Sequence, residues 1–243
     1  DSSIHIMWTG DDVCSSMKTG RFTEFEQLTN KKPFFWLNWP VNDYSTDHLL
    51  MGKGEVLNVK YSNNVAFEGI VTNPMQQAEP SKLSIFTICD YSWNTSKFDM
   101  DKSYNDSFKY IEEKEFDSLK LISSHLTNAT LYEGKYFEEA PELVVLINKY
   151  NEEKNKTNYE NLISYFNKMI TNINNFINNS KNTKLKESML PWINALLDAS
   201  KAMVSYLTIL KDFSSLDKAK LKELLNEGNL YFENSKTHEE PVL

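Results

Sequence analysis

Residues 33–39 read PFFWLNW, a short aromatic and apolar run that begins at one proline and stops at the next. Two comparable runs are IHIMW at residues 4–8 and VAFEGIVTN at residues 65–73. Short apolar runs bounded by turn residues predict β-strands. Stretches with helical character accompany them at residues 23–31 and 81–93. Strands that alternate with helices indicate a parallel α/β layout.

The second half of the chain has a different pattern of apolar residues. From about residue 140 they recur at steps of three and four, as on one face of an amphipathic helix. Four segments follow this spacing: residues 142–150, 159–177, 190–210 and 216–225. Pro191 fits the first turn of its helix. Helices joined by polar loops predict an antiparallel bundle, in which the apolar faces form the core.

The predicted fold class is therefore mixed, with an α/β part followed by an all-α part. We expect the first domain over residues 1–130, a helical bundle over residues 131–228, and a polar tail or linker over residues 229–243. The segment LTNATLYEGKYFEEAPE, residues 126–142, marks the boundary between the two halves. The chain opens directly into a strand without an initiator Met, so we expect it to be a piece of something longer.

Composition excludes several classes of function. The chain has 243 residues, 40% of them hydrophobic, and a net charge of -8 with a pI near 5.1. An acidic chain is a poor nucleic-acid binder, because phosphate binding needs a basic face. Arg21 is the only arginine, which leaves almost no bidentate phosphate clamps. No apolar run approaches the ~20 residues of a membrane span, so we expect none.

Metal and cofactor sites have no support in the sequence. Cys14 and Cys89 form no metal-ligand spacing, and we expect free core thiols, with a disulfide as the alternative. The four histidines are scattered, and there is no glycine-rich phosphate loop. We therefore predict no metal and no cofactor.

The paired acids Asp11 and Asp12 follow the first predicted strand and its Gly10 turn. Paired carboxylates are the usual apparatus of glycoside hydrolysis. They are also ordinary residues at the start of a helix, where they cap free N–H groups and oppose the helix dipole. These residues alone leave both interpretations open.

The strongest functional signal lies in PFFWLNWPVNDYSTDHLLMGKG, residues 33–54. Trp36, Asn38 and Asp43 lie at or just beyond a strand end, and Asn73 ends the next strand. Indole rings pack on the apolar faces of sugars, and Asn and Asp supply fixed partners for hydroxyl groups. In parallel α/β folds the ligand lies at this end of the strands. By themselves these residues could equally be a core tryptophan, turn asparagines and a helix cap.

A family resemblance strengthens the sugar-site interpretation. IHIMWTG, WLNWPVNDYSTDHLLMG, VTNPMQQAE and DYSWNT, in this order over about residues 4–110, resemble glycoside hydrolase family 84. These are β-N-acetylglucosaminidases and include O-GlcNAcases and bacterial enzymes labelled hyaluronidases. The resemblance implies the C-terminal part of a (β/α)8 TIM barrel, of which the chain holds the last three strands, followed by a helical bundle. It also implies a secreted or cell-surface protein.

The resemblance also implies roles for four residues. Trp36 would wall the pocket around the N-acetyl group, and Asn38 would help to position the sugar near it. Asp43 would accept hydrogen bonds from the outer hydroxyls, and Asn73 would bind a neighbouring hydroxyl. The family's catalytic pair of adjacent aspartates belongs to an earlier strand than MWTGDD, so we expect no catalytic residue in this chain. We therefore expect Asp11 and Asp12 to start a helix.

The sequence thus predicts part of a retaining β-N-acetylglucosaminidase, acting on GlcNAc-terminated glycans or O-GlcNAc proteins through an oxazoline. The missing N-terminal half of the barrel would be its partner, because an open sheet edge needs one. The isolated fragment would be inactive because it lacks the catalytic pair. Two alternatives remain open. One is a non-catalytic interaction or structural module, and the other is a different hydrolase that uses Asp11 or Asp12.

Overall fold

A computed structural model describes residues 3–17, 19–44, 48–54, 57, 67–127 and 139–238. The chain divides into two compact units. The sheet unit contains residues 1–111 and 126–138, and the helical unit contains residues 112–125 and 139–243. Parts of three predicted segments lie outside the described residues: residues 65–66 of a strand run, residues 128–138 of the boundary segment, and residues 239–243 of the tail.

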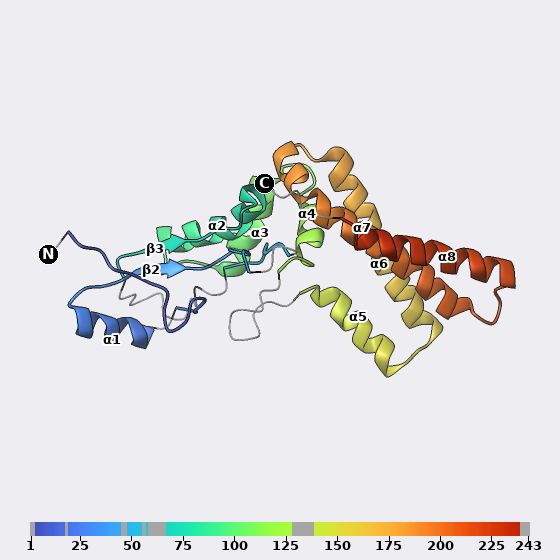
Figure 1. Cartoon of the computed structure of the whole chain (residues 1–243), viewed down its shortest axis with the longest axis horizontal. Coiled ribbons are helices and arrows are strands. Elements are labelled where there is room, and N and C mark those ends of the chain that lie inside the picture. Colours follow the sequence, from blue (N-terminus) through green and yellow to red (C-terminus); the bar gives the residue numbers. More distant parts are fainter. Residues whose placement is uncertain are drawn as a thin grey trace. The chain divides into compact units, whose positions relative to one another are not determined.

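Three parallel strands form the sheet of the sheet unit, in the order β1-β2-β3 (Figure 1). They are β1 (Met7–Trp8), β2 (Phe34–Leu37) and β3 (Gly69–Thr72). Each lies inside one of the three predicted runs, and the prediction of a parallel α/β layout is confirmed. Because the strands are parallel, their carboxyl ends lie at the same edge of the sheet.

One face of the sheet is covered by helix α1 (Thr19–Thr29). Phe22 of α1 places its ring 5.7 Å from the ring of Trp8 and 5.4 Å from that of Phe35. Phe35 and Leu37 lie on this face and are 1% and 0% exposed. Alternation along a strand sends every second side chain to each face. The aromatic residues of β1, β2 and α1 therefore build one apolar layer.

The opposite face of the sheet is less covered. Met7 is 56% exposed, and its partners in register, Phe34 and Gly69, lie on the same face. The Phe34 ring lies over Gly69, where a Cβ atom would stand only 2.5 Å from its Cε1 atom. Trp36 shares this face and is half-buried. Among the described residues of the sheet unit, the sheet thus has one packed face and one partly open aromatic face.

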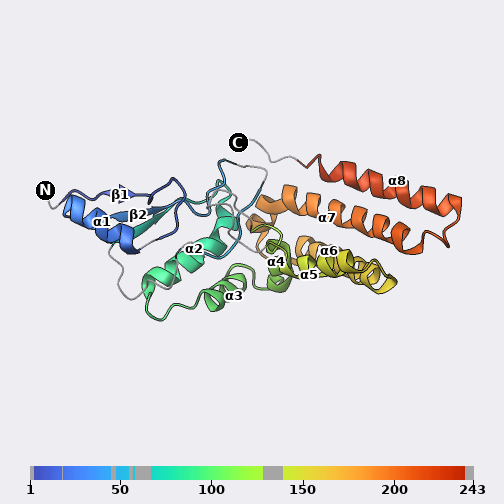
Figure 2. The same ribbon diagram turned by 90° about the horizontal axis from the view of Figure 1, so that it is seen from below.

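Helices α2 (Ala78–Trp93) and α3 (Met100–Ile111) follow β3 and pack against each other (Figure 2). The segment after β2 is bonded to α2. Ser84 donates to the Gly52 carbonyl at 2.6 Å, and the Gly54 N–H donates to Thr87 Oγ1 at 3.2 Å. Cys89 of α2 is exposed and Cys14 is buried, and both are free thiols. The prediction of core thiols is therefore wrong for Cys89, which lies on the outer side of α2.

The helical unit is an antiparallel bundle, as the sequence predicts. It contains five helices among the described residues: α4 (Phe116–Ser123), α5 (Pro141–Glu152), α6 (Lys156–Asn179), α7 (Thr183–Asp212) and α8 (Lys218–Ser235). Figure 1 shows α6, α7 and α8 side by side. Met169, Ile173 and Phe176 of α6 are fully buried, as are Leu185 and Met189 of α7. The apolar stripes read from the sequence thus form the core.

Helix α4 packs on α6, although its residues fall within the range 1–130 that the sequence assigned to the first domain. Its Leu119 and Ile122 are 0% exposed, and Ser118 donates to Asn172 Oδ1 of α6 at 3.2 Å. A helix of eight residues is too short to be stable alone, so tertiary packing decides where it belongs.

Two local predictions in the bundle are wrong. Pro191 is not at a helix start, because α7 begins at Thr183, where the Asn182 side chain accepts from the Leu185 N–H at 3.1 Å. The buried stripe of α7 extends ahead of the proline and holds the earlier turns in place. Residues 229–235 are not a tail, because they continue α8. Tyr206 of α7 donates to Asn229 Oδ1 at 2.8 Å and anchors this extension.

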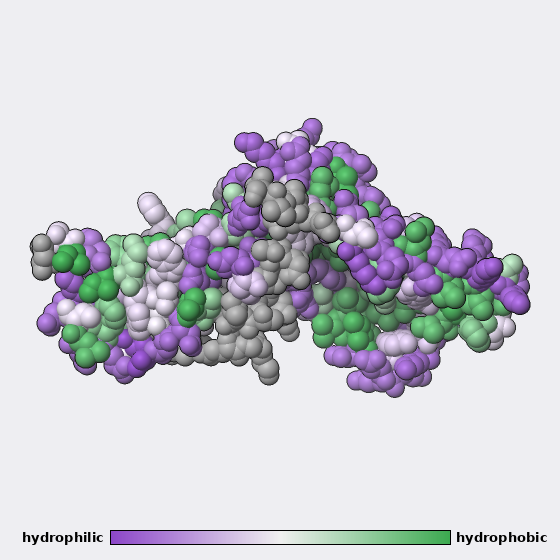
Figure 3. All heavy atoms as spheres, viewed as in Figure 1, coloured by the Kyte–Doolittle hydropathy of each residue, from purple (hydrophilic) through white to green (hydrophobic). Residues whose placement is uncertain are grey.

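The surface of the helical unit carries exposed apolar residues where α7 turns into α8. Leu210, Phe213 and Leu225 are 52%, 65% and 45% exposed. Figure 3 shows hydrophobic residues gathered over the same end of these helices. None of the described helices combines the length and apolar composition that crossing a bilayer requires.

Candidate functional site

Three loops leave the carboxyl ends of the strands, and the asparagines and Asp43 predicted for the sugar site lie on two of them. Residues 38–44 follow β2, residues 73–77 follow β3, and residues 9–17 follow β1. The Asn73 N–H donates to the Leu37 carbonyl at 2.9 Å, which extends the β2–β3 ladder by one residue. This bond brings the start of the loop after β3 next to the end of β2.

Asn38 is the centre of a hydrogen-bond network that joins all three loops. Its Oδ1 accepts from Trp36 Nε1 at 2.7 Å and from Asn73 Nδ2 at 3.1 Å. Its Nδ2 donates to the Val13 carbonyl in the loop after β1. Asn38 is 8% exposed, and a buried amide needs such partners to offset its lost hydration. The structure therefore brings three of the four predicted residues into direct contact.

Asp43, the fourth predicted residue, lies in the loop after β2 and is exposed. The negative charge of its carboxylate contributes to raising the pKa of two neighbouring side chains. Burial raises the pKa of the Cys14 thiol, and the Asp43 charge raises it further. Burial also raises the pKa of Tyr44 to about 12, with smaller contributions from Cys14 and Asp43. Asp43 makes no hydrogen bond within the described residues, so its oxygens are open acceptors at this end of the sheet.

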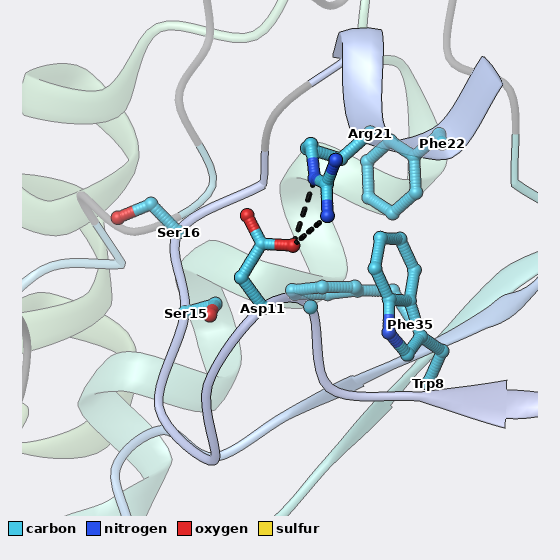
Figure 4. A pocket seen from close by; sticks show the side chains of 8 residues that line it. Trp8, Asp11, Ser15, Ser16, Arg21, Phe22 and Phe35 are labelled. Atoms are coloured by element: carbon cyan, nitrogen blue, oxygen red, sulfur yellow. Dashed lines mark hydrogen bonds and ion pairs between the residues drawn. The ribbon is translucent and has the colours of Figure 1, made fainter. Parts of the chain in front are cut away.

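Asp11 and Asp12 lie together in the turn after β1, eight and seven residues before α1 begins at Thr19, and the helix-start prediction is wrong for both. Arg21 on α1 instead binds the Asp11 carboxylate, with Nε 2.8 Å and Nη2 2.6 Å from Oδ1 (Figure 4). The Asp12 N–H donates to Ser15 Oγ at 2.9 Å. These bonds shape the turn, so a structural role is better supported than an acid–base one.

The Asp11–Arg21 pair lines a small pocket with aromatic walls. Figure 4 shows Trp8, Phe22 and Phe35 beside the pair, with Ser15 and Ser16 across from it. The carboxylate and guanidinium point toward each other and thus neutralise their charges. Exposed pairs of this kind contribute about 0–1 kcal/mol to stability.

Gly10 allows this turn to form, because its φ is +99° and a Cβ atom there would stand 2.5 Å from Ser15 Cβ. We expect Gly10→Ala to lower the free energy of unfolding by about 1–3 kcal/mol. The same change should loosen the contact of the Val13 carbonyl with Asn38. Thermal unfolding measures the first effect. Gly20→Ala is the control, because no atom lies within 4 Å of its Cβ position in α1 and the change should be neutral or stabilising. Equal losses in both variants would contradict the prediction.

Sequence reasoning missed three contributors to the site. Val13 acts through its backbone carbonyl, which no side-chain motif reveals. The sequence indicates only a core thiol at Cys14, whereas in the structure its thiol is close enough to Asp43 for the carboxylate to raise its pKa. Asn42, directly before Asp43 in the sequence, is buried at 3% exposure. Its position next to Asp43 is the only sequence feature that points to a role in the site. No group of His, Cys, Asp and Glu among the described residues could hold a metal ion.

Comparison with known proteins identifies the family. Residues 1–124, just over half of the chain, match the family model described as β-N-acetylglucosaminidase. Over 100% of its length the chain is similar to the solved structure of CpGH84D, at 35% sequence identity and a TM-score of 0.90. The chain belongs to glycoside hydrolase family 84, the β-N-acetylglucosaminidases.

Two other solved structures share the fold. CpGH84B matches 96% of the chain at 24% identity and a TM-score of 0.81. A mutant of the Thermobaculum terrenum O-GlcNAc hydrolase matches 93% of it at 20% identity and a TM-score of 0.76. The chain spans 41% of CpGH84D, 41% of CpGH84B and 48% of the O-GlcNAc hydrolase. It is thus similar to less than half of each of these three chains.

Proposed function

We propose that this chain is the C-terminal part of a β-N-acetylglucosaminidase and that β1, β2 and β3 are the last three strands of a (β/α)8 barrel. The partly open aromatic face with Met7, Phe34 and Trp36 supports this, because barrel strands turn such a face inward. Three strands cannot close a barrel. The missing strands would cover this face and pair with the open edge of the sheet.

The observation that carries the proposal is the network of Trp36, Asn38 and Asn73 at the carboxyl ends of the strands, with the open carboxylate of Asp43 on the same loop as Asn38. We propose that these residues form one wall of a GlcNAc pocket. Trp36 would lie against the N-acetyl group and Asp43 would accept from the outer hydroxyls. Asn73 would bind a neighbouring hydroxyl through the part of its amide that Asn38 does not occupy. Asn38 would hold the other side chains in place.

The proposed reaction retains the anomeric configuration and uses the substrate's own acetamido group. The acetamido oxygen bonds to the anomeric carbon as the glycosidic C–O bond breaks. One carboxylic acid gives its proton to the leaving oxygen, and a second carboxylate takes the amide proton, which leaves a neutral oxazoline. Water then adds to the anomeric carbon, its proton passes to the first carboxylate, and the ring opens to GlcNAc as the amide proton returns. We assign both carboxyl groups to residues outside this chain.

The proposed substrates are GlcNAc-terminated glycans or O-GlcNAc proteins. The hydrolase alternative that uses Asp11 or Asp12 has less support, because Arg21 binds the Asp11 carboxylate and Asp12 is held in the turn through its N–H group. An interaction module without catalysis is the remaining alternative, and the following assay separates it from the proposal.

We expect the chain alone to be inactive on an aryl β-GlcNAc substrate and a longer protein that includes the upstream strands to be active. In the longer protein, Asp43→Ala should lower kcat/KM by about 100-fold, the value of a charged hydrogen-bond partner. Asp11→Ala should lower it less than about fivefold, since it removes only an exposed ion pair.

Each other outcome favours a different function. Activity of the chain alone that disappears with Asp11→Ala would favour the hydrolase that uses Asp11. An inactive longer protein would favour the interaction module. Steady-state kinetics on five proteins gives all these comparisons: the chain alone, the chain alone with Asp11→Ala, the longer protein, and its Asp43→Ala and Asp11→Ala variants.

A further inference from the structure

The loop after β2 carries two neighbouring polar residues with opposite environments. Asp43 is exposed, whereas Asn42, one residue before it, is only 3% exposed. Burying an amide costs free energy unless its polar atoms find partners. A buried asparagine at this position therefore indicates that the backbone beside Asp43 is held in a defined position.

The Asn42 amide bonds to the chain on both sides of the site. Its Nδ2 donates to the His48 carbonyl at 2.8 Å, which ties the residue before Asp43 to a residue further along the chain. The same Nδ2 has a longer contact of 3.4 Å with Gln77 Oε1, in the residue that precedes α2. Asn42 thus joins the loop after β2 to the loop after β3.

Two more contacts lie near Asn42. The last residue of β3, Thr72, donates through Oγ1 to the Trp39 carbonyl in the loop after β2, and the Leu50 N–H approaches Met75 Sδ in the loop after β3 at 3.1 Å. Along the chain, Trp39 precedes Asn42 and Leu50 follows it. A change at Asn42 alone should therefore shift the Asp43 segment without separating the two loops.

We infer that Asn42 is a positioning residue for Asp43: its buried amide fixes the loop so that the Asp43 carboxylate meets the sugar hydroxyls. This rests on the proposed function of Asp43. Both bonds of Asn42 are donated by its NH2 group. Asn42→Asp therefore removes the donors at almost unchanged side-chain volume, and Asn42→Ala removes them without adding charge.

The test uses the longer active protein and two aryl β-glycosides, of GlcNAc and of its 4-deoxy analogue. We expect Asn42→Asp and Asn42→Ala to lower kcat/KM for the GlcNAc substrate by about 10- to 30-fold, mostly through KM, because a small misplacement weakens a directional contact. The 4-deoxy substrate lacks a hydroxyl that Asp43 would bind. The same two substitutions should therefore lower kcat/KM for this substrate by less than about threefold.

A double-mutant cycle with Asp43→Ala gives the sharpest readout. If Asn42 acts through Asp43, adding Asn42→Ala to Asp43→Ala should change kcat/KM by less than about threefold. Gln77→Ala removes only the longer contact and should cause a smaller loss than Asn42→Ala. Thermal unfolding of each variant checks that the protein stays folded at the assay temperature.

The outcomes separate the inference from the proposed function. Losses that are equal for the two substrates, or that multiply in the double variant, would show a general structural role and overturn the inference while the proposed function stands. A wild-type longer protein without activity on the GlcNAc substrate would overturn the proposed function and the inference together.

Discussion

Replacing Asn38 with aspartate is expected to lower kcat/KM for an aryl β-GlcNAc substrate by about 1,000-fold in the longer protein, equivalent to ~4 kcal/mol. The change keeps the shape of the side chain but removes the donor to the Val13 carbonyl. A carboxylate oxygen would then face that carbonyl oxygen in a site that is only 8% exposed. Leaving a buried polar group without its partner costs more than the hydrogen bond itself contributes.

The loss of activity caused by Asn38→Asp should become smaller as pH falls. Burial and the facing carbonyl would raise the pKa of the introduced carboxyl, so its neutral form appears at a higher pH than for an ordinary aspartate. The neutral carboxyl can donate to the Val13 carbonyl. Activity of Asn38→Asp relative to wild type should therefore rise as pH falls, and Asn38→Ala should show no such recovery.

Steady-state kinetics between about pH 4 and pH 8 checks both parts of the Asn38 prediction. Asn167→Asp is the matched control, because this asparagine is exposed on α6 and should tolerate the change. The prediction fails if Asn38→Asp retains activity within about tenfold of wild type. It also fails if Asn38→Asp and Asn38→Ala have the same pH profile, because the network would then not depend on the donor.

The pairing of Trp36 with Asn38 could be predicted because it follows from strand geometry. Residues two apart point to the same face of a strand, and the indole N–H reaches the amide oxygen in the structure. The nearness of Asn73 follows from the parallel register, because both asparagines end neighbouring strands. These contacts require only the strand period and the parallel order, and both are visible in the sequence.

The role of Asp11 could not be predicted in the same way. The sequence offers helix capping as the local explanation for two acids after a glycine. The structure pairs Asp11 with Arg21, which lies ten residues along the chain on a helix folded back over the sheet. That contact depends on how α1 packs through Phe22 on Trp8 and Phe35. Short-range sequence signals carry no information about such packing.

The errors at Pro191 and at residues 229–235 have a common cause. Proline is favoured at helix starts, and a polar segment near a chain end reads as a tail. In both places contacts between α7 and its neighbours outweigh the local signal. Buried Leu185 and Met189 keep α7 helical ahead of its proline, and Tyr206 holds Asn229. Helical stability in proteins comes mainly from tertiary packing.

Glu112 connects three helix ends in the helical unit through a fully buried carboxylate. It is 0% exposed and accepts from Ser180 Oγ at 2.6 Å and, over a longer 3.4 Å, from the Asn182 N–H. It also accepts from the N–H groups of Lys114 and Glu115 at 3.1 Å and 3.0 Å. The carboxylate therefore satisfies donors beside the start of α4, the end of α6 and the start of α7.

The hydrogen bonds of Glu112 outweigh its burial. Burial is the largest single influence and raises the pKa of the carboxyl, but the bonds from Ser180 and the backbone N–H groups together lower it below the ordinary value. A lowered pKa in the folded state means that the ionised form contributes stability above the unfolded-state pKa of about 4.3. That contribution is lost as pH falls through the folded-state value.

We expect Glu112→Ala to lower the stability of the helical unit by about 3 kcal/mol at pH 7, because it leaves buried donors without an acceptor. Glu112→Gln keeps one acceptor and should cost less. Hydrogen–deuterium exchange of amides in α6 and α7, with thermal unfolding, measures the loss. Glu113→Ala is the matched control, because Glu113 is exposed beside it and should change stability by less than about 0.5 kcal/mol.

The difference in the free energy of unfolding between wild type and Glu112→Gln should shrink as pH falls below about 4. A difference that stays constant down to pH 2 would show that the charge of Glu112 does not stabilise the bundle.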